Sequence, residues 1–250
     1  MIALYLRRGL AAGLLAGLLA GVFAFFVGEP LLDRAMSLEE RPTAHGHGAQ
    51  AEGGHSHGED SEAVFGRTTQ KVGLFFATGL SGTFLGGLFG MVFAFFRGRM
   101  EAGSDWGRSL SLAAAIFAGF VLIPFLKYPA NPPTVGDPET IGVRTAAYFT
   151  LVAVSLLGVL ISWYAARTLR DRGVGQPVRQ ISVGLGLAAF VALLLLVFPD
   201  TSNPGNFPAG LLWNFRLASL GTQIVLWTGI GVVFGLLCER ANRRTGKGVA

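Results

Sequence analysis

The stretch RRGLAAGLLAGLLAGVFAFFVG, residues 7–28, decides the fold class of this chain. After its two arginines it runs for 20 residues without a charged side chain, which is long enough to cross a bilayer as a helix. The apolar part is too long for that of a signal peptide, and no small-x-small cleavage site follows it. We therefore expect a retained transmembrane helix at the start of the chain.

Further apolar runs of similar length follow along the 250 residues, of which only 14% are charged, against about 25% in soluble domains. Long apolar runs of this kind are typical of membrane-spanning helices. The sequence predicts an all-α polytopic membrane protein in which residues 1–250 form a single integral membrane domain. The six expected spans lie near 9–27, 72–96, 109–126, 145–166, 179–198 and 217–238.

The distribution of charge predicts the orientation. With both termini on one side, 13 of the 20 Lys and Arg residues fall on that side, whereas 11 of the 15 acids fall on the other. Cationic loops stay in the cytoplasm, so we expect three in–out–in hairpins with cytoplasmic termini. The net charge of +5 then reflects the excess of Lys and Arg on the cytoplasmic side, which orients the chain in the lipid bilayer. It gives no support to a nucleic-acid partner.

All four histidines of the chain lie in HGHGAQAEGGHSHG, residues 45–58, between the first two spans. The surrounding residues 41–62 are rich in Gly, Ala, His and acids, so we expect a flexible extracytoplasmic loop. Imidazole pairs of the form His-x-His suit divalent metals, and nearby carboxylates add oxygen donors. The predicted metal ligands are His45, His47, His55, His57 and Asp60. A solvated linker without a metal function and a pH sensor are the alternatives.

A second group of polar residues is expected at the outer ends of the spans, where it would shape an ion entry. Its members are Glu29, Asp33, Lys127, Asn131, Asp137, Glu139 and Arg216. The segment Asp137-Pro138-Glu139 is also typical of an ordinary helix start, which is the stronger interpretation for these residues. No ionisable residue lies in the central turns of the expected spans, which argues against a proton-coupled exchanger.

Small residues recur along the first two expected spans and form a smooth ridge on each helix. The favoured interpretation packs the two ridges against each other, and the alternative is a docking face for the helix of a separate subunit. The residues concerned are Gly9, Gly13, Gly17, Gly21, Gly82, Gly86 and Gly90. After a break at Pro30, residues 31–40 (LLDRAMSLEE) predict a short amphipathic helix on the membrane surface.

Enzyme signatures are missing from the sequence. It contains no Ser-His-Asp set, no Cys-His pair, no HExxH helix and no nucleotide-binding P-loop. Cys238 is the single cysteine, so an intrachain disulfide is impossible. We expect a protein that is not an enzyme and holds no tightly bound cofactor.

Three segments resemble the CbtA family of cobalt transporter subunits, and LKYPANPP followed by GDPETI is the most specific match. The segments are RRGLAAGLLAGLLAGVFAFFVGEPLLDRAMSLEE at 7–40, PFLKYPANPPTVGDPETIGVRTAAYF at 124–149 and FPAGLLWNFRLASLGTQIVLW at 207–227. The resemblance implies a bacterial-type inner-membrane protein that takes up cobalt for cobalamin synthesis. It also implies a small single-span companion of the CbtB type.

The function that these observations favour is a membrane subunit of a divalent-metal importer, with cobalt as the cargo and nickel or zinc as further candidates. A non-transporting scaffold or metal sensor, which passes ions to another permease, is the alternative. The uncharged interior of the expected spans favours this alternative.

Overall fold

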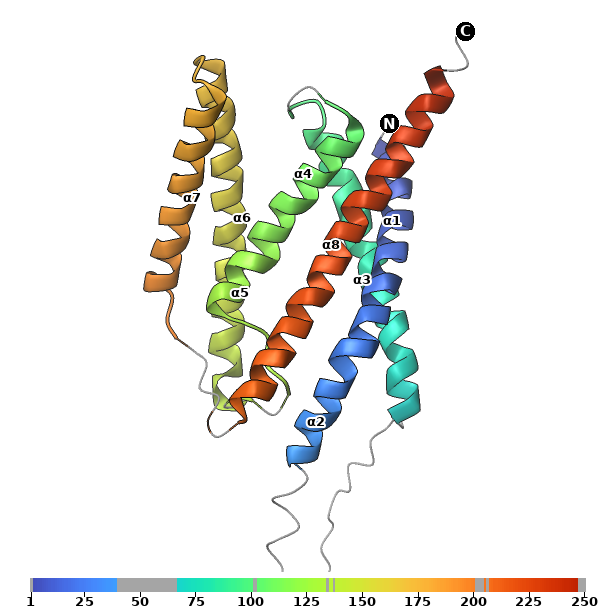
Figure 1. Cartoon of the computed structure of the whole chain (residues 1–250), viewed down its shortest axis with the longest axis vertical. Coiled ribbons are helices and arrows are strands. Elements are labelled where there is room, and N and C mark those ends of the chain that lie inside the picture. The colour runs from blue at the N-terminus through green and yellow to red at the C-terminus, as the bar shows by residue number, and fades with distance from the viewer. Residues whose placement is uncertain are drawn as a thin grey trace, which may run out of the picture.

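The computed structural model describes residues 2–39, 67–100, 103–133, 135–136, 138–200, 205 and 207–246. Over these residues the chain is a bundle of helices without strands (Figure 1). Six helical stretches are long and apolar enough to cross a membrane, which confirms the predicted all-α, six-span fold class. The stretches are Ile2–Leu38, Lys71–Phe96, Asp105–Lys127, Ile141–Asp171, Gln176–Val197 and Ala209–Arg243.

Two of the six stretches contain a π-helical turn, and a 3-10 turn precedes a third. The elements in chain order are α1 (Ile2–Phe23), the π-turn η1 (Ala24–Gly28), α2 (Glu29–Glu39), α3 (Arg67–Phe96), α4 (Asp105–Phe117), the π-turn η3 (Ala118–Leu122), α5 (Ile123–Lys127), the 3-10 turn η4 (Pro138–Thr140), α6 (Ile141–Asp171), α7 (Gln176–Val197) and α8 (Ala209–Gly246).

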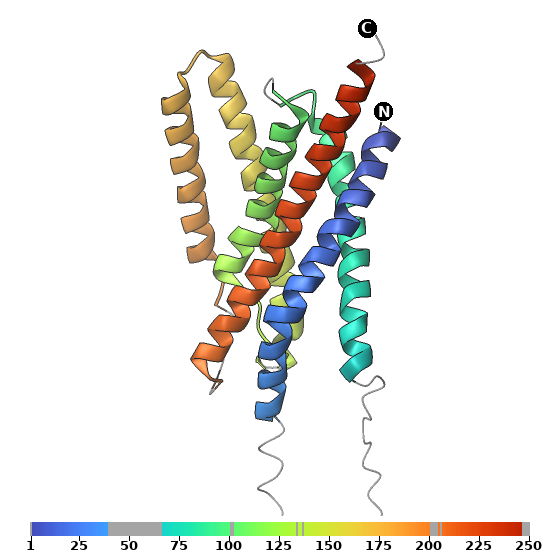
Figure 2. The same ribbon diagram turned by 45° about the vertical axis from the view of Figure 1, so that its right-hand side comes forward.

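Helix α8 lies at the centre of the arrangement, between α1 on one side and α4 on the other (Figures 1 and 2). Helix α3 packs on α1, and α6 and α7 form a hairpin that contacts η3 and α5. Aromatic rings fill the core between α1, α3 and α8, where Phe93 and Phe234 are fully buried with ring centroids 4.8 Å apart. Both termini lie at one end of the bundle, and the ends of α2 and α3 that flank residues 40–66 lie at the other (Figure 1).

The two glycine ridges face each other across the contact between α1 and α3. A Cβ atom at Gly13 would overlap the carbonyl oxygen of Gly82, and one at Gly82 would lie 2.6 Å from the Cα atom of Gly17. Gly9 meets Gly86 and Gly90 in the same way, and Gly21 meets the Thr78 side chain. The backbones of the first two spans therefore approach too closely for another helix to lie between them.

The predicted break at Pro30 is wrong, because α1, η1 and α2 continue as one helical stretch. A proline inside a helix removes one hydrogen bond and its ring clashes with the carbonyl four residues earlier. Here that carbonyl belongs to Phe26, which lies in the wider π-turn η1, where the backbone N–H of Glu29 bonds to the Ala24 oxygen. The wider turn makes room for the ring. The predicted amphipathic helix exists as α2, but it extends the first span.

A π-turn before a proline occurs again in the third span. The π-turn η3 ends two residues before Pro124, as η1 does before Pro30, and the Ile123 N–H bonds to the Ala118 oxygen. The segments FAFFVGEPLL at 23–32 and FAGFVLIPFL at 117–126 are identical at six of ten positions. A shared local sequence therefore produces the same distortion in two spans.

Candidate functional site

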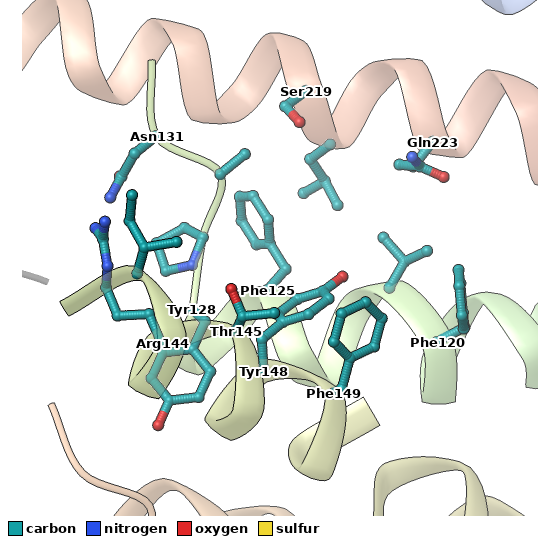
Figure 3. Close-up of a pocket in the computed structure, with 15 residues that line it drawn as sticks. Phe120, Phe125, Tyr128, Asn131, Arg144, Thr145, Tyr148, Phe149, Ser219 and Gln223 are labelled. Atoms are coloured by element: carbon teal, nitrogen blue, oxygen red, sulfur yellow. The ribbon is translucent and has the colours of Figure 1, made fainter. Parts of the chain in front are cut away.

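A cavity of about 450 Å³ opens between η3 and α5, the first turns of α6 and the first half of α8 (Figure 3). It lies toward the end of the bundle opposite the two termini, because α6 and α8 both begin at that end (Figure 1). The lining residues are Phe120, Val121, Phe125, Tyr128, Pro129, Ala130, Asn131, Ile141, Arg144, Thr145, Tyr148, Phe149, Ser219, Leu220 and Gln223.

Polar groups enter this mainly apolar cavity from two sides. Ser219 and Gln223 lie on α8, four residues apart and therefore on one helix face, and Thr145 and Tyr148 lie opposite them on α6 (Figure 3). These side chains offer hydroxyl and amide oxygens. Arg144 adds a guanidinium group, and no lining residue carries a carboxylate, imidazole or thiolate. The cavity therefore combines weak, neutral oxygen donors with one positive charge.

A pair of hydrogen bonds between Asn131 and Arg216, here called the Asn131–Arg216 clamp, lies at the edge of the cavity near the end of the bundle. The Asn131 Oδ1 atom accepts hydrogen bonds from the Arg216 Nη2 atom at 2.8 Å and from its Nε atom at 3.3 Å. This contact ties the connection after α5 to the first turns of α8, across 85 residues of sequence. Arg144 approaches the same connection, since a side chain at Gly136, where φ is +118°, would overlap its guanidinium group. The positive φ is what favours glycine there, since the Arg144 side chain is flexible at its end and could shift.

Lys127 and Tyr128 attach this connection to the end of α7. The Lys127 side chain is only 10% exposed, and its Nζ atom donates to the Leu195 carbonyl at 3.0 Å and to Asp200 Oδ1 at 2.5 Å. The last carbonyls of a helix lack partners within the helix and carry partial negative charge, so the amine satisfies the end of α7. The Tyr128 hydroxyl donates to the Pro199 carbonyl at 2.8 Å. Burial raises the pKa of Tyr128, so its phenol remains a donor.

Aromatic packing lies at the end of the cavity toward the middle of the bundle. Phe120 belongs to the π-turn η3 and lines the cavity, and its ring meets that of Trp227 edge-on, with centroids 6.1 Å apart. Trp227 follows Gln223 by one helical turn and is 4% exposed. The cavity thus extends from the Asn131–Arg216 clamp at one end to this aromatic contact at the other.

The residues predicted to shape an ion entry fall in several places. Asn131 lines the cavity and holds Arg216, whereas Lys127 bonds to α7. Asp33 on α2 pairs with Lys71 on α3 at 3.7 Å, and neither Glu29 nor Glu139 lines the cavity.

Several predicted site residues lie outside the described residues. They are the metal ligands His45, His47, His55, His57 and Asp60, the ion-entry residue Asp137, and the predicted flexible loop at 41–62. Within the described part of the chain, no group of three or more His, Cys, Asp or Glu side chains could hold a metal.

Sequence reasoning missed Arg144, Thr145 and Tyr148 as members of a site. Their spacing at i, i+1 and i+4 gives α6 a polar edge near its start, as Ser219 and Gln223 do on α8. Two polar edges near the starts of two spans are the signal that could have found the cavity.

A second network missed from the sequence lies at the opposite end of the bundle. Asp105, only 3% exposed, accepts from Arg97 at 2.8 and 3.1 Å, from Arg108 at 3.3 Å and from Asn242 at 3.0 Å. These partners connect α4 with the end of α3 and with α8. The carboxylate is buried but fully partnered, which is the arrangement that a buried charge requires.

Comparison with known proteins assigns the chain to a family. No curated protein and no solved structure matches it significantly. A family model described as "Probable cobalt transporter subunit (CbtA)" matches residues 2–239, nearly the whole chain. The chain therefore belongs to the CbtA family of probable cobalt transporter subunits, and it is a multi-pass membrane protein.

Proposed function

We propose that this chain is the membrane subunit of a cobalt importer and that the cavity between α5, α6 and α8 receives the ion from the extracytoplasmic side. One observation carries the proposal. The cavity lies toward the same end of the bundle as the ends of α2 and α3, which flank the segment with all four histidines (Figure 1). Capture and entry would then share one face of the membrane.

The distribution of positive charge supports this orientation. Arginines crowd the end of the bundle that holds the termini, and such residues favour the cytoplasmic side. Those in described segments at this end include Arg7, Arg8, Arg97, Arg99, Arg108, Arg167, Arg170, Arg172, Arg179, Arg240 and Arg243. The cavity, at the other end, would accordingly face outward, in an inner membrane of bacterial type.

The chemistry of the cavity suits an ion in transit. Hydroxyl and amide oxygens can replace part of the hydration shell of a dication, but without carboxylates they hold it weakly. Conduction requires binding that is favourable enough for entry and weak enough for release. Arg144 opposes the entry of a positive ion, so entry would depend on local ion concentration and on the membrane potential, which contributes about 4.6 kcal/mol per 100 mV for two charges.

The His-rich segment would supply that local concentration. Two His-x-His pairs with nearby acids can bind Co²⁺, and also Ni²⁺ or Zn²⁺, with modest selectivity. Since members of this family act as subunits, we further propose a small single-span companion of the CbtB type. The imported cobalt would serve cobalamin synthesis.

A non-transporting scaffold or sensor is the second candidate. It is favoured by the lining near Gln223, which has no ionisable side chain among the described residues, and by the contact between Phe120 and Trp227 beside it.

Reconstitution of the full chain into liposomes distinguishes the two candidates. With an inward-negative potential, the proposed importer gives cobalt entry, either alone or after addition of the companion. Cobalt binding by the chain without entry in either case would contradict the importer and support the scaffold.

A further inference from the structure

A second cavity, of about 380 Å³, lies at the end of the bundle that holds the termini. It is formed by the turn between α3 and α4, the first turns of α4 and the last turns of α6. Four arginines line it, namely Arg99, Arg108, Arg167 and Arg170. This cavity shares no residue with the cavity near α5.

Acidic residues contact three of these arginines. Arg167 and Arg170 lie 3.9 and 3.6 Å from one carboxylate, that of Asp171, which is 61% exposed. Arg108 shares Asp105 with Arg97. Among the described residues that line the cavity, four carry a guanidinium group and none carries a carboxylate.

Arg99 is held in place by two contacts with Phe95. Its Nη1 atom donates to the Phe95 carbonyl, and its guanidinium carbon lies 4.3 Å from the centroid of the Phe95 ring. Guanidinium groups recognise phosphate oxygens through paired N–H donors, and several of them around one cavity are suited to an oxyanion.

Ser104 and Ser111 also line the cavity, and another part of its wall is apolar. Trp163, Met100 and Ala166 line it, and the Trp163 ring packs edge-on against Phe96 with centroids 5.4 Å apart. Tryptophan at the end of a membrane span is typical of the headgroup region of a bilayer. A site with an arginine rim and an apolar wall at this depth fits a phosphate that is attached to acyl chains.

We propose that this cavity binds the headgroup phosphate of an anionic phospholipid. The bound lipid bridges the start of α4 and the end of α6, and its phosphate oxygens accept hydrogen bonds from the arginines that line the cavity. Basic pockets between spans on the cytoplasmic side are a recognised mode of anionic-lipid binding. The same oxyanion chemistry would also accept free phosphate, so the test must separate these two sources.

The test measures thermal unfolding of the purified full chain in a neutral detergent. Phosphatidylglycerol and cardiolipin are added in one arm, phosphatidylcholine in a second and inorganic phosphate in a third. The proposal predicts a rise in unfolding temperature with the two anionic lipids only. Equal rises with phosphatidylcholine, a rise with inorganic phosphate alone, or no rise with any addition would overturn it.

Two substitutions assign the effect to the cavity. Arg99→Gln and Arg167→Gln each remove one guanidinium group, and each is expected to weaken the response to phosphatidylglycerol about tenfold in lipid concentration. Arg172→Gln, on the same face but outside the cavity lining, is the matched control and should respond as the wild type does. If the control loses the response to the same extent as both cavity variants, the binding is diffuse surface attraction and the proposed site is wrong. Variants are compared only when their unfolding temperatures without lipid equal that of the wild type, and the lipid arms on the wild-type chain decide the proposal in any case.

Discussion

Lys127 is a nearly buried amine whose partners come from another helix. Because its Nζ atom satisfies the Leu195 carbonyl near the end of α7, we expect Lys127→Met to leave that carbonyl without a partner. The cost is about 1–3 kcal/mol of unfolding free energy. Asp200→Asn removes the other partner, which is 92% exposed, so solvent screens that ion pair and the loss should be below about 1 kcal/mol. Thermal unfolding in detergent measures both variants, and an Asp200→Asn loss as large as that of Lys127→Met would contradict this role.

Gln223 and Ser219 supply oxygen atoms to the cavity from one face of α8. We expect Gln223→Leu to lower cobalt uptake about tenfold and Ser219→Ala to lower it less, because each removes an oxygen donor that a partly dehydrated ion requires. Thr222→Val is the matched control on the same helix, since the Thr222 hydroxyl donates to the Ala218 carbonyl at 2.9 Å and does not line the cavity. Radioactive cobalt accumulation in cells, normalised to protein in the membrane, measures the effect. Equal losses in all three variants would show that the cavity oxygens have no special role.

The residues of the candidate site come together through contacts between distant parts of the chain. The sequence can therefore suggest single residues of the site, but not which residues meet. The sequence identified Asn131 and Arg216 as polar residues near span ends, but their contact joins positions 85 residues apart. No local pattern specifies such a pair. Lys127 was predicted to shape an ion entry because it follows the third span. Its hydrogen bond to Leu195 of α7 could not be predicted, because the sequence around Lys127 does not specify which helix lies beside it.

The contact between α1 and α3 gives the clearest prediction at the scale of elements. Gly86→Val places a side chain against the Gly9 carbonyl and the Gly13 backbone, neither of which can move without separating the two helices. We expect loss of folded protein, with at least about 3 kcal/mol of destabilisation. Gly73→Ala on the same helix faces open space and is the control, with an unchanged or slightly raised stability. Fluorescence-detected size exclusion compares the two variants, and a folded, monodisperse Gly86→Val protein at wild-type yield would contradict the close packing.

The apolar runs predicted all six spans because a helix in lipid must satisfy its own backbone and present apolar side chains. The residues at which the helices begin and end were less well predicted. The first helical stretch begins at Ile2 and continues to Leu38, past two arginines near its start and past Pro30. Charged residues can extend a helix beyond the apolar core, and the π-turn η1 removes the steric conflict that a proline normally creates. Proline alone therefore does not predict where a membrane helix ends.

Across the whole molecule, the His-rich segment and the cavity belong to one proposed route. Replacement of His45, His47, His55 and His57 by Ala should reduce cobalt accumulation at limiting cobalt and leave it nearly unchanged in excess, since capture matters only when the ion is scarce. A control with Gln50 and Ser56 replaced by Ala retains the imidazoles. Uptake measured over a range of cobalt concentrations tests this, and equal curves for the two variants would exclude a capture role for the histidines.

The orientation of the bundle is the claim on which the route depends, and thiol accessibility measures it most directly. In a Cys238→Ala background, which removes the single native cysteine, Ser219→Cys places a thiol in the cavity and Ser111→Cys places one in the arginine-lined cavity at the opposite end. A membrane-impermeant maleimide applied to intact cells should label Cys at position 219, more slowly when cobalt is present, and should not label Cys at position 111 until the cells are opened. Labelling of position 111 but not of position 219 in intact cells would place the cavity on the cytoplasmic side and contradict the proposed direction of transport.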